Sequence, residues 1–264
     1  MSNVAILIPT YKPKYYLERC LDSIQNQSVS KEFFKVYLVL NGSDLKYENY
    51  IKKILRNYQF EHQLFCLSEA GVSNARNFLI ENSSEDFIIF LDDDDLISSN
   101  YLEELYLVTD LDFMGISNIV NFEDDLNSLK SNYIGVSFLK LDNIETSKLR
   151  SRRHYSSPVA KMLHRGMIGD VRFNTSLSIG EDSLFMAEIS GKIKGVKKTN
   201  DDVFYYVCER EGSVTRTTVN KPKEIKRLAH LTYLYSKMLF SNNFDRQFIF
   251  SRLLATIKHS KKLL

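Results

Sequence analysis

Short apolar runs alternate with helical segments over the first hundred residues, and this alternation restricts the fold more than any other feature. Four runs rich in strand-forming residues cover residues 3–8, 35–40, 63–67 and 86–91. Segments with apolar residues at helical spacing separate these runs. Because parallel strands need crossover connections, the pattern predicts an α/β fold with a Rossmann-like, mostly parallel central sheet and helices on both faces.

Beyond about residue 110 the alternation becomes irregular. Strands are expected at 113–120, 133–138, 193–198 and 203–207, and a helix is expected to begin near Asp182. From residue 221 onward the apolar spacing is helical, which predicts a C-terminal helical extension.

Polar residues follow three of the predicted strands at their carboxyl ends. Pro9-Thr10-Tyr11 closes the first strand, Asn41-Gly42-Ser43 the second, and Asp92 to Asp95 the fourth. Ligands of open α/β sheets bind outside the carboxyl ends of the strands. We therefore expect these three clusters to converge on one edge of the sheet.

The four consecutive aspartates require a cation or hydrogen-bond donors, because adjacent like charges raise one another's pKa. Mn²⁺ or Mg²⁺ would suit them, since hard divalent ions take oxygen ligands. In an extended stretch, Asp92 and Asp94 would face one side and Asp93 and Asp95 the other. The alternative is an acidic loop in which Asp95 or Ser98 caps a following helix. The residues alone leave both interpretations open.

A second acidic pair, Glu181 and Asp182, stands in the stretch SIGEDSLF. A carboxylate beside a hydroxyl group can accept its proton as that hydroxyl attacks, which is general-base catalysis. Two acids can equally favour the N-terminus of a helix without any catalytic role.

Composition excludes several classes of protein. The chain has 35 Lys and Arg against 33 Asp and Glu, a net charge of +2, so no strongly basic nucleic-acid-binding surface is expected. Cys20, Cys66 and Cys208 lack metal-site or disulfide spacing and fit reduced thiols in the cytoplasm. The N-terminal apolar run is too short for a signal peptide, and no stretch approaches the ~20 apolar residues of a membrane span.

Five stretches together resemble the successive motifs of family-2 glycosyltransferases, which have the GT-A fold. They are ILIPTYK, YLERCLDSIQNQS, VLNGSD, EAGVSNARNFLIENSSEDFIIFLDDDD and GDVRFNTSLSIGED. The resemblance covers about residues 3–190. It implies a GT-A domain over 1–220, with a nucleotide-binding half at 1–110 and an acceptor-binding half at 111–220, followed by the helical extension at 221–264.

The resemblance also implies an activity. Members of the family transfer a sugar with inversion, using Mn²⁺ or Mg²⁺, from a nucleotide-diphosphate donor. We expect a UDP-sugar donor and a hydroxyl acceptor on a glycan or a lipid-linked glycan. The expected pathway is synthesis of a bacterial surface polysaccharide such as capsule or lipopolysaccharide.

The family's functional residues map onto matching positions of this chain. Asp182 would be the catalytic base, Glu181 would contact the acceptor, and Asp94 would bind the metal. Asn41 replaces the aspartate that many members use to read the base. The residues expected to contact the nucleotide-sugar are Pro9, Thr10, Tyr11, Asn41, Arg76, Asp92, Asp93 and Arg210.

Two basic segments lie outside these motifs. SRRHYSSP, at 151–158, could contact a diphosphate or an acceptor, or could be a solvated loop. The C-terminal tail has no acidic residue after Asp245 but several Lys and Arg. That tail could rest peripherally on the inner face of an anionic membrane, mediate oligomerisation, or pack back on the domain.

Two other functions compete with sugar transfer. A nucleotidyltransferase would share the sheet and the metal-binding carboxylates, but it usually carries a Gly-rich phosphate loop near its start. The corresponding residues here, Pro9-Thr10-Tyr11-Lys12, do not form one. A non-catalytic sugar- or metal-binding module would use the aspartates for binding alone.

Overall fold

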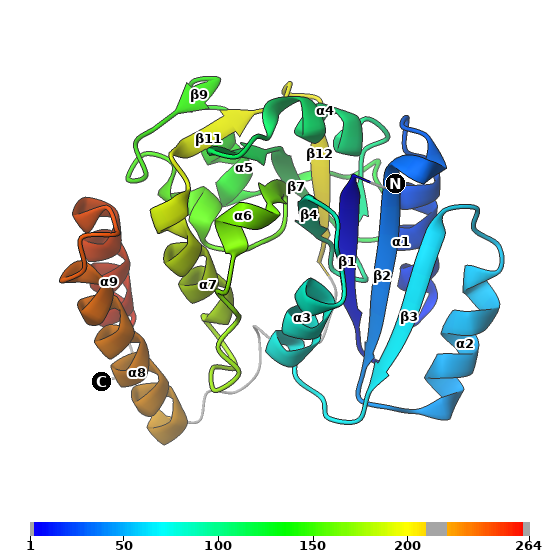
Figure 1. The fold of residues 1–264 in the computed structure, drawn as a ribbon, viewed down its shortest axis with the longest axis horizontal. Helices are drawn as coiled ribbons and strands as arrows, with labels where there is room; N and C mark the ends of the chain where they lie inside the picture. The colour runs from blue at the N-terminus through cyan, green and yellow to red at the C-terminus, as the bar shows by residue number, and fades with distance from the viewer. Residues whose placement is uncertain (1–2, 210–220, 261–264) are drawn as a thin grey trace.

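The computed structural model describes residues 3–209 and 221–260, and a mixed eight-stranded sheet forms its centre (Figure 1). The first four strands in spatial order are parallel, whereas β10 is antiparallel to both of its neighbours. The predicted α/β fold with a mostly parallel sheet is confirmed. In spatial order the strands are β3 (Glu61–Leu67), β2 (Phe34–Asn41), β1 (Val4–Thr10), β4 (Phe87–Phe90), β10 (Lys161–His164), β6 (Phe113–Ile116), β11 (Gly195–Lys198) and β9 (Ile144–Glu145).

A second, smaller sheet has four strands, and one of its edge strands, β5, follows the aspartate run in the chain. The inner strand β12 is antiparallel to β5 and parallel to β7. Because β5 begins immediately after Asp95, this sheet fixes the end of the aspartate run. In spatial order the strands are β5 (Leu96–Ile97), β12 (Phe204–Cys208), β7 (Asn118–Phe122) and β8 (Lys130–Ser131).

Helices cover both faces of the large sheet. Right-handed crossovers put α1 and α2 on one face and α3 on the other, where α3 packs against β1 and β2 (Figure 1). The α-helices are α1 (Tyr15–Gln25), α2 (Leu45–Leu55), α3 (Val72–Glu81), α4 (Tyr101–Val108), α5 (Tyr133–Phe138), α6 (Arg165–Ile168), α7 (Glu181–Ile189), α8 (Lys221–Leu239) and α9 (Arg246–Ser260). The 3₁₀ helices are η1 (Lys31–Phe33), η2 (Arg152–Tyr155) and η3 (Ser190–Lys192).

Strand β1 lies at the centre of the core. All of its residues are buried, as expected for a parallel strand covered on both faces. Helix α1 buries Leu17, Cys20, Leu21 and Ile24, the residues whose spacing predicts the helix. The pairing of β1 with β2 and β4 therefore lies in the buried interior of the protein.

The segment 133–138 is a helix, so the expected strand there is wrong. Its sequence, YIGVSF, is rich in strand-forming residues, but Asn132 precedes it and accepts a hydrogen bond from the Ile134 N–H (2.8 Å). This N-cap starts a helix. Gly135 then allows the helix to approach β7 so closely that an added Cβ would lie 2.1 Å from the Ile119 carbonyl oxygen.

Helices α8 and α9 lie side by side at one end of the molecule (Figure 1). Leu228, Leu231 and Tyr235 of α8 are buried, as are Phe248 and Ile249 of α9. The pair is therefore packed back on the domain. Within 3–209 and 221–260, no helix is both long enough and apolar enough to cross a membrane.

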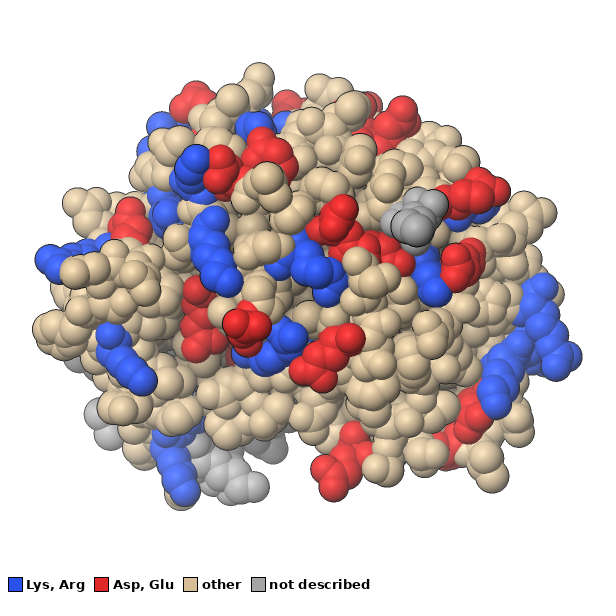
Figure 2. Space-filling model, viewed as in Figure 1, with Lys and Arg blue, Asp and Glu red and all other residues tan. Residues whose placement is uncertain are grey.

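Acidic and basic side chains are interspersed on the face of the molecule shown in Figure 2. This mixture agrees with the small net charge of +2. The face carries no continuous basic track of the kind that binds a nucleic-acid backbone.

Replacing Gly135 with Ala should destabilise the fold. The new methyl group would collide with the Ile119 carbonyl, so either α5 or β7 must shift. We expect a loss of about 1–3 kcal/mol in the free energy of unfolding, measured by urea denaturation. Val136→Ala, on the exposed side of the same helix, is the control and should cost less. Equal stability of G135A and the wild type would contradict the close approach of α5 to β7.

Candidate functional site

The carboxyl ends of β1, β2 and β4 meet at one edge of the sheet, the lower edge in Figure 1. Thr10 ends β1 and Asn41 ends β2. Asp92 comes one residue after Leu91, whose N–H still donates to a carbonyl of β1 (3.1 Å). We call this edge the rim. The three polar clusters that the sequence places after strands therefore lie together.

Arg76 of α3 joins two distant parts of the chain at the rim. Its Nη1 donates to Oδ1 of Asp182 in the first turn of α7 (2.6 Å), and its Nη2 donates to Oδ1 of Asp92 (3.0 Å). Arg76 is only 4% exposed, and its guanidinium lies 5.4 Å from the centre of the Phe173 ring. The GVSNARN, FLDDDD and IGED motifs thus meet at a single side chain.

Burial and opposing charges set the pKa values of this cluster. Burial raises the pKa of Asp182 to about 6, while Arg76 lowers it and Glu181 raises it. Burial lowers the pKa of Arg76, but the carboxylates of Asp182 and Asp92 more than reverse this effect and raise it. Burial therefore outweighs the ion pair at Asp182, whose carboxylate is more basic than an exposed one.

Two of the four aspartates are held inside the protein. The Thr10 hydroxyl donates to Asp93, and Asp95 accepts from the Tyr205 hydroxyl (2.7 Å) and the Cys208 N–H (2.8 Å). Burial raises the pKa of Asp95, and the neighbouring carboxylates add to this effect. Asp93 and Asp95 thus stabilise the turn.

The alternative of a helix cap and the extended stretch are both wrong. Neither Asp95 nor Ser98 caps α4, whose N-cap residue is Asn100, and Asp95 instead bonds to β12. The aspartates form a turn in which the Asp95 N–H donates to the Asp92 carbonyl (3.1 Å). The predicted division of sides nevertheless holds, since Asp93 and Asp95 are buried and Asp92 and Asp94 are partly exposed.

The residues of the rim fit a divalent cation that is shared with a ligand. Asp92 and Asp94 present partly exposed carboxylates, and Mg²⁺ in proteins often takes one or two carboxylates with phosphate oxygens and waters. Among the residues that the structure describes, no group of three or more His, Cys, Asp or Glu side chains could hold a metal ion unaided. The role of Asp94 as a metal ligand remains a prediction.

Three predicted nucleotide contacts differ in exposure. Pro9 is buried within β1, whereas Tyr11 is 51% exposed and its ring lies beside Gly42. The side-chain oxygen of Asn41 accepts from the Gly71 N–H (2.7 Å), which ties the end of β2 to the start of α3. Of the three, Tyr11 offers the ring surface on which a base could stack.

Glu181 is buried next to Asp182, and its Oε2 has no hydrogen-bond partner within 3–209 and 221–260. A buried carboxylate oxygen of this kind is costly to leave unsatisfied. The position therefore suits a ligand hydroxyl group.

Sequence reasoning missed Tyr205 and Lys161. The Tyr205 hydroxyl binds Asp95 and accepts from the Asp92 N–H (3.2 Å), so it holds both ends of the aspartate turn. Lys161 is 3% exposed and donates to the Ser157 and Val159 carbonyls (2.5 and 2.6 Å). Burial lowers the pKa of Lys161 to about 7, although Asp182 raises it. The only sequence signal for Lys161 was the presence of a lysine in a short apolar strand.

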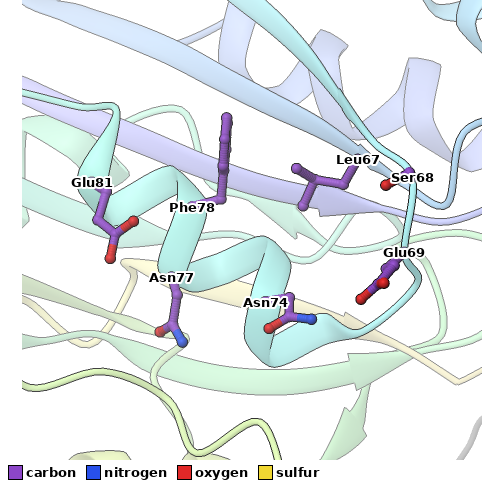
Figure 3. A pocket seen from close by; sticks show the side chains of 7 residues that line it. All are labelled: Leu67, Ser68, Glu69, Asn74, Asn77, Phe78 and Glu81. Carbon is purple, nitrogen blue, oxygen red and sulfur yellow. The ribbon is translucent and has the colours of Figure 1, made fainter.

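A pocket of about 330 Å³ lies beside the rim, on the outer side of α3 (Figure 3). Figure 3 shows Asn74, Asn77 and Glu81 projecting from α3, with Glu69 across from its first turn. Two acidic residues and no basic residue line this pocket, so it does not suit a diphosphate. Arg210, the remaining predicted phosphate contact, lies outside the described residues.

Known protein families and proteins resemble this chain in sequence. The family model of Glycosyl transferase family 2 matches residues 5–168. The poly(ribitol-phosphate) beta-N-acetylglucosaminyltransferase TarS of Staphylococcus aureus is 22% identical over 96% of this chain and 45% of its own length. The poly(ribitol-phosphate) beta-glucosyltransferase of Bacillus spizizenii is 26% identical over 80% of this chain and 33% of its own length. The chain thus spans less than half of either relative.

Solved structures share the fold. TarS residues 1–349 in complex with UDP-GlcNAc superpose with a TM-score of 0.76 at 19% identity, covering 97% of this chain and 72% of that one. The mannosyltransferase PcManGT from Pyrobaculum calidifontis, in complex with GDP-Man and Mn²⁺, gives a TM-score of 0.65 at 13% identity, covering 99% of this chain and 72% of that one. At these identities the likeness establishes the GT-A fold alone.

Replacing Asp182 with Asn should change how stability depends on pH. The pKa of Asp182 is raised from an ordinary 3.8 to about 6, so its contribution to stability is complete below about pH 4 and is lost as the pH rises through 6. Asn does not titrate. The free energy of unfolding of the wild type should therefore fall relative to that of D182N by up to about 3 kcal/mol between pH 4 and 7.

Urea denaturation over this pH range measures that difference. Asp112→Asn, which removes a partly exposed carboxylate far along the chain from Asp182, is the control and should track the wild type more closely. A wild type that gains stability relative to D182N as the pH rises would contradict the raised pKa.

Proposed function

The chain belongs to glycosyl transferase family 2, and from this membership we propose that it transfers a sugar from a UDP-sugar to a hydroxyl group of a poly(polyol phosphate). The observation that supports this most strongly is the contact of Arg76 with both Asp92 and Asp182. It brings a predicted donor-binding carboxylate and a predicted catalytic base to one guanidinium at the rim.

The donor would lie along the carboxyl ends of β1, β2 and β4. Tyr11, with its half-exposed ring, would stack on the base, and Asn41 would line the base pocket. Asp92 would bind the ribose, and Arg76 would face the diphosphate, since its Nε has no hydrogen-bond partner within the described part of the chain. TarS, the relative whose structure contains UDP-GlcNAc, supports a UDP-sugar.

A divalent cation, Mn²⁺ or Mg²⁺, would be held by Asp94 together with the diphosphate. When bound, it would offset the charge that develops on the departing diphosphate. PcManGT, whose structure contains Mn²⁺, supports this assignment.

Asp182 would act as the general base. The acceptor oxygen attacks C1 of the sugar from the side opposite the diphosphate, and its proton passes to the Asp182 carboxylate. The bond between C1 and the diphosphate oxygen breaks, and UDP leaves with that electron pair, so the anomeric configuration inverts. A pKa of about 6 leaves Asp182 ionised at pH 7 yet basic enough to accept the proton.

The relatives narrow the class of acceptor. TarS and the Bacillus enzyme are named for transfer to poly(ribitol-phosphate), which favours a teichoic-acid-type polymer over capsule or lipopolysaccharide. Glu181, with its unsatisfied buried oxygen, would bind an acceptor hydroxyl beside Asp182. Membership of glycosyl transferase family 2 disfavours the alternative of a nucleotidyltransferase. The other alternative, a non-catalytic binding module, is distinguished from an enzyme by whether the protein turns over a nucleotide-sugar.

Asp182→Asn should strongly reduce turnover while donor binding is retained. The wild type, incubated with UDP-GlcNAc or UDP-glucose, Mn²⁺ and poly(ribitol phosphate), should release UDP. Loss of the base should lower kcat by about 10²- to 10⁴-fold with little change in donor affinity. Enzyme-coupled UDP detection and calorimetry measure the two quantities. Full activity in D182N would remove Asp182 from this role, and no UDP release by the wild type would reject the proposed reaction.

Asp94→Ala should weaken metal-dependent binding of the donor. Without this carboxylate the cation loses a protein ligand, so the gain in UDP affinity on adding Mn²⁺ should shrink by about tenfold or more. Calorimetric titration with UDP, with and without Mn²⁺, measures this gain. Asp112→Ala is the control, and an unchanged gain in D94A would assign the metal to a neighbouring aspartate.

A further inference from the structure

A basic pocket lies between η2, the start of α5 and α9. Its volume is about 360 Å³, within the range of small-molecule sites. Four of its lining residues are cationic and none is acidic, and a tyrosine and two serines add hydroxyl groups. The cationic residues are Arg152, Arg153, Arg252 and Lys258.

None of these four cations is paired with a carboxylate within the described residues. Two of the guanidinium groups instead donate to backbone carbonyls: that of Arg153 to Tyr133 (3.2 Å), and that of Arg252 to Arg152. The Nε of Arg252 is buried and has no partner within 3–209 and 221–260. Clustered like charges repel, so the pocket would be stabilised by an anion.

The carbonyl contacts hold the guanidinium groups of Arg153 and Arg252 in place. Arg252 also lies over the Phe248 ring, with its guanidinium 5.2 Å from the ring centre. Phe248 in turn packs on Tyr155 of η2, with ring centres 5.1 Å apart. The two basic segments therefore share one packed core. A preorganised guanidinium suits a phosphate, because its planar fork matches two phosphate oxygens.

Strand β10 and helix α7 connect the pocket to the rim. Strand β10 is antiparallel to β4, so the loop before Lys161, which contains Ser156, lies near the end of β4 that leads into the aspartates. Helix η2 also packs against α7, whose first turn carries Asp182. An extended polymer that presents a hydroxyl group to Asp182 could continue into this pocket.

We propose that the pocket formed by Arg152, Arg153, Arg252 and Lys258 binds a phosphodiester group of the acceptor polymer. The inference rests on the proposed function and deepens it, because it assigns the recognition of the acceptor's charge to η2 and α9. A neutral glycan would gain nothing from this pocket. The pocket therefore selects a polyanionic acceptor, whereas the rim binds the sugar donor.

A membrane surface is the competing occupant. Phe250 and Leu254 of α9 are about half exposed, so α9 could contact lipid. The concave shape and the packing of η2 against α7 favour a polymer chain that reaches the rim.

The double variant Arg153→Gln with Lys258→Gln tests the proposal, since both side chains are exposed and the fold should tolerate the changes. We expect the KM for poly(ribitol phosphate) to rise about fivefold to tenfold, with kcat and the KM for the UDP-sugar little changed. Added salt should raise the wild-type KM more steeply than that of the variant. Arg246→Gln, an exposed charge on α9 outside the pocket, should behave like the wild type.

Direct binding separates this inference from the proposed function. Affinity for poly(ribitol phosphate), measured without donor, should fall by a similar factor in the double variant, and equal affinity would overturn the proposal. If the wild type transfers sugar to the polymer but both proteins have the same KM, the pocket assignment fails and the proposed function stands. If the variant instead loses binding to phosphatidylglycerol vesicles while polymer affinity is unchanged, the pocket serves a membrane and the proposal is wrong.

Discussion

The buried ion pairs of Arg76 are the interaction on which the site depends. A guanidinium that is 4% exposed must be neutralised, and Asp92 and Asp182 do so from two different elements. Breaking such a buried arrangement by removing one partner is usually costly. The same contacts place the end of β4 and the start of α7 at one point, so the cluster that neutralises the charge also assembles the proposed donor and base positions.

The C-terminal helices support this arrangement from the other side. Arg227 of α8 donates to the Ile179 carbonyl (2.9 Å), just before Gly180, which has a φ of 88° and closes the turn into α7. The Tyr235 hydroxyl of α8 lies 3.2 Å from that of Ser183 in α7. The helical extension thus holds the turn that presents Glu181 and Asp182. It also brings α9 against η2, where it completes the basic pocket.

The sequence predicts those parts of the structure that are set by local pattern. The spacing of apolar residues predicts β1, β2 and β4. The polar residues at the strand ends predict that Thr10, Asn41 and Asp92 meet, because neighbouring parallel strands bring their carboxyl ends to one edge of the sheet. Tyr205 could not be found this way, since its contact with Asp95 depends on the pairing of β12 with β5. The basic pocket joins Arg152 and Arg252, which are a hundred residues apart, and neither segment alone indicates a cavity. Helix α5 was missed because its strand-like residues are overridden by the Asn132 cap and the close approach at Gly135.

In the proposed reaction, Asp182 activates an acceptor hydroxyl on the side opposite the departing UDP. The anomeric configuration of the sugar in the transferred product, read by NMR after reaction with an α-linked UDP-sugar, tests this geometry. One displacement at C1 inverts the configuration, so we expect a β-linked product. An α-linked product would require a second displacement or a different attack geometry, and it would contradict the role of Asp182 as a general base.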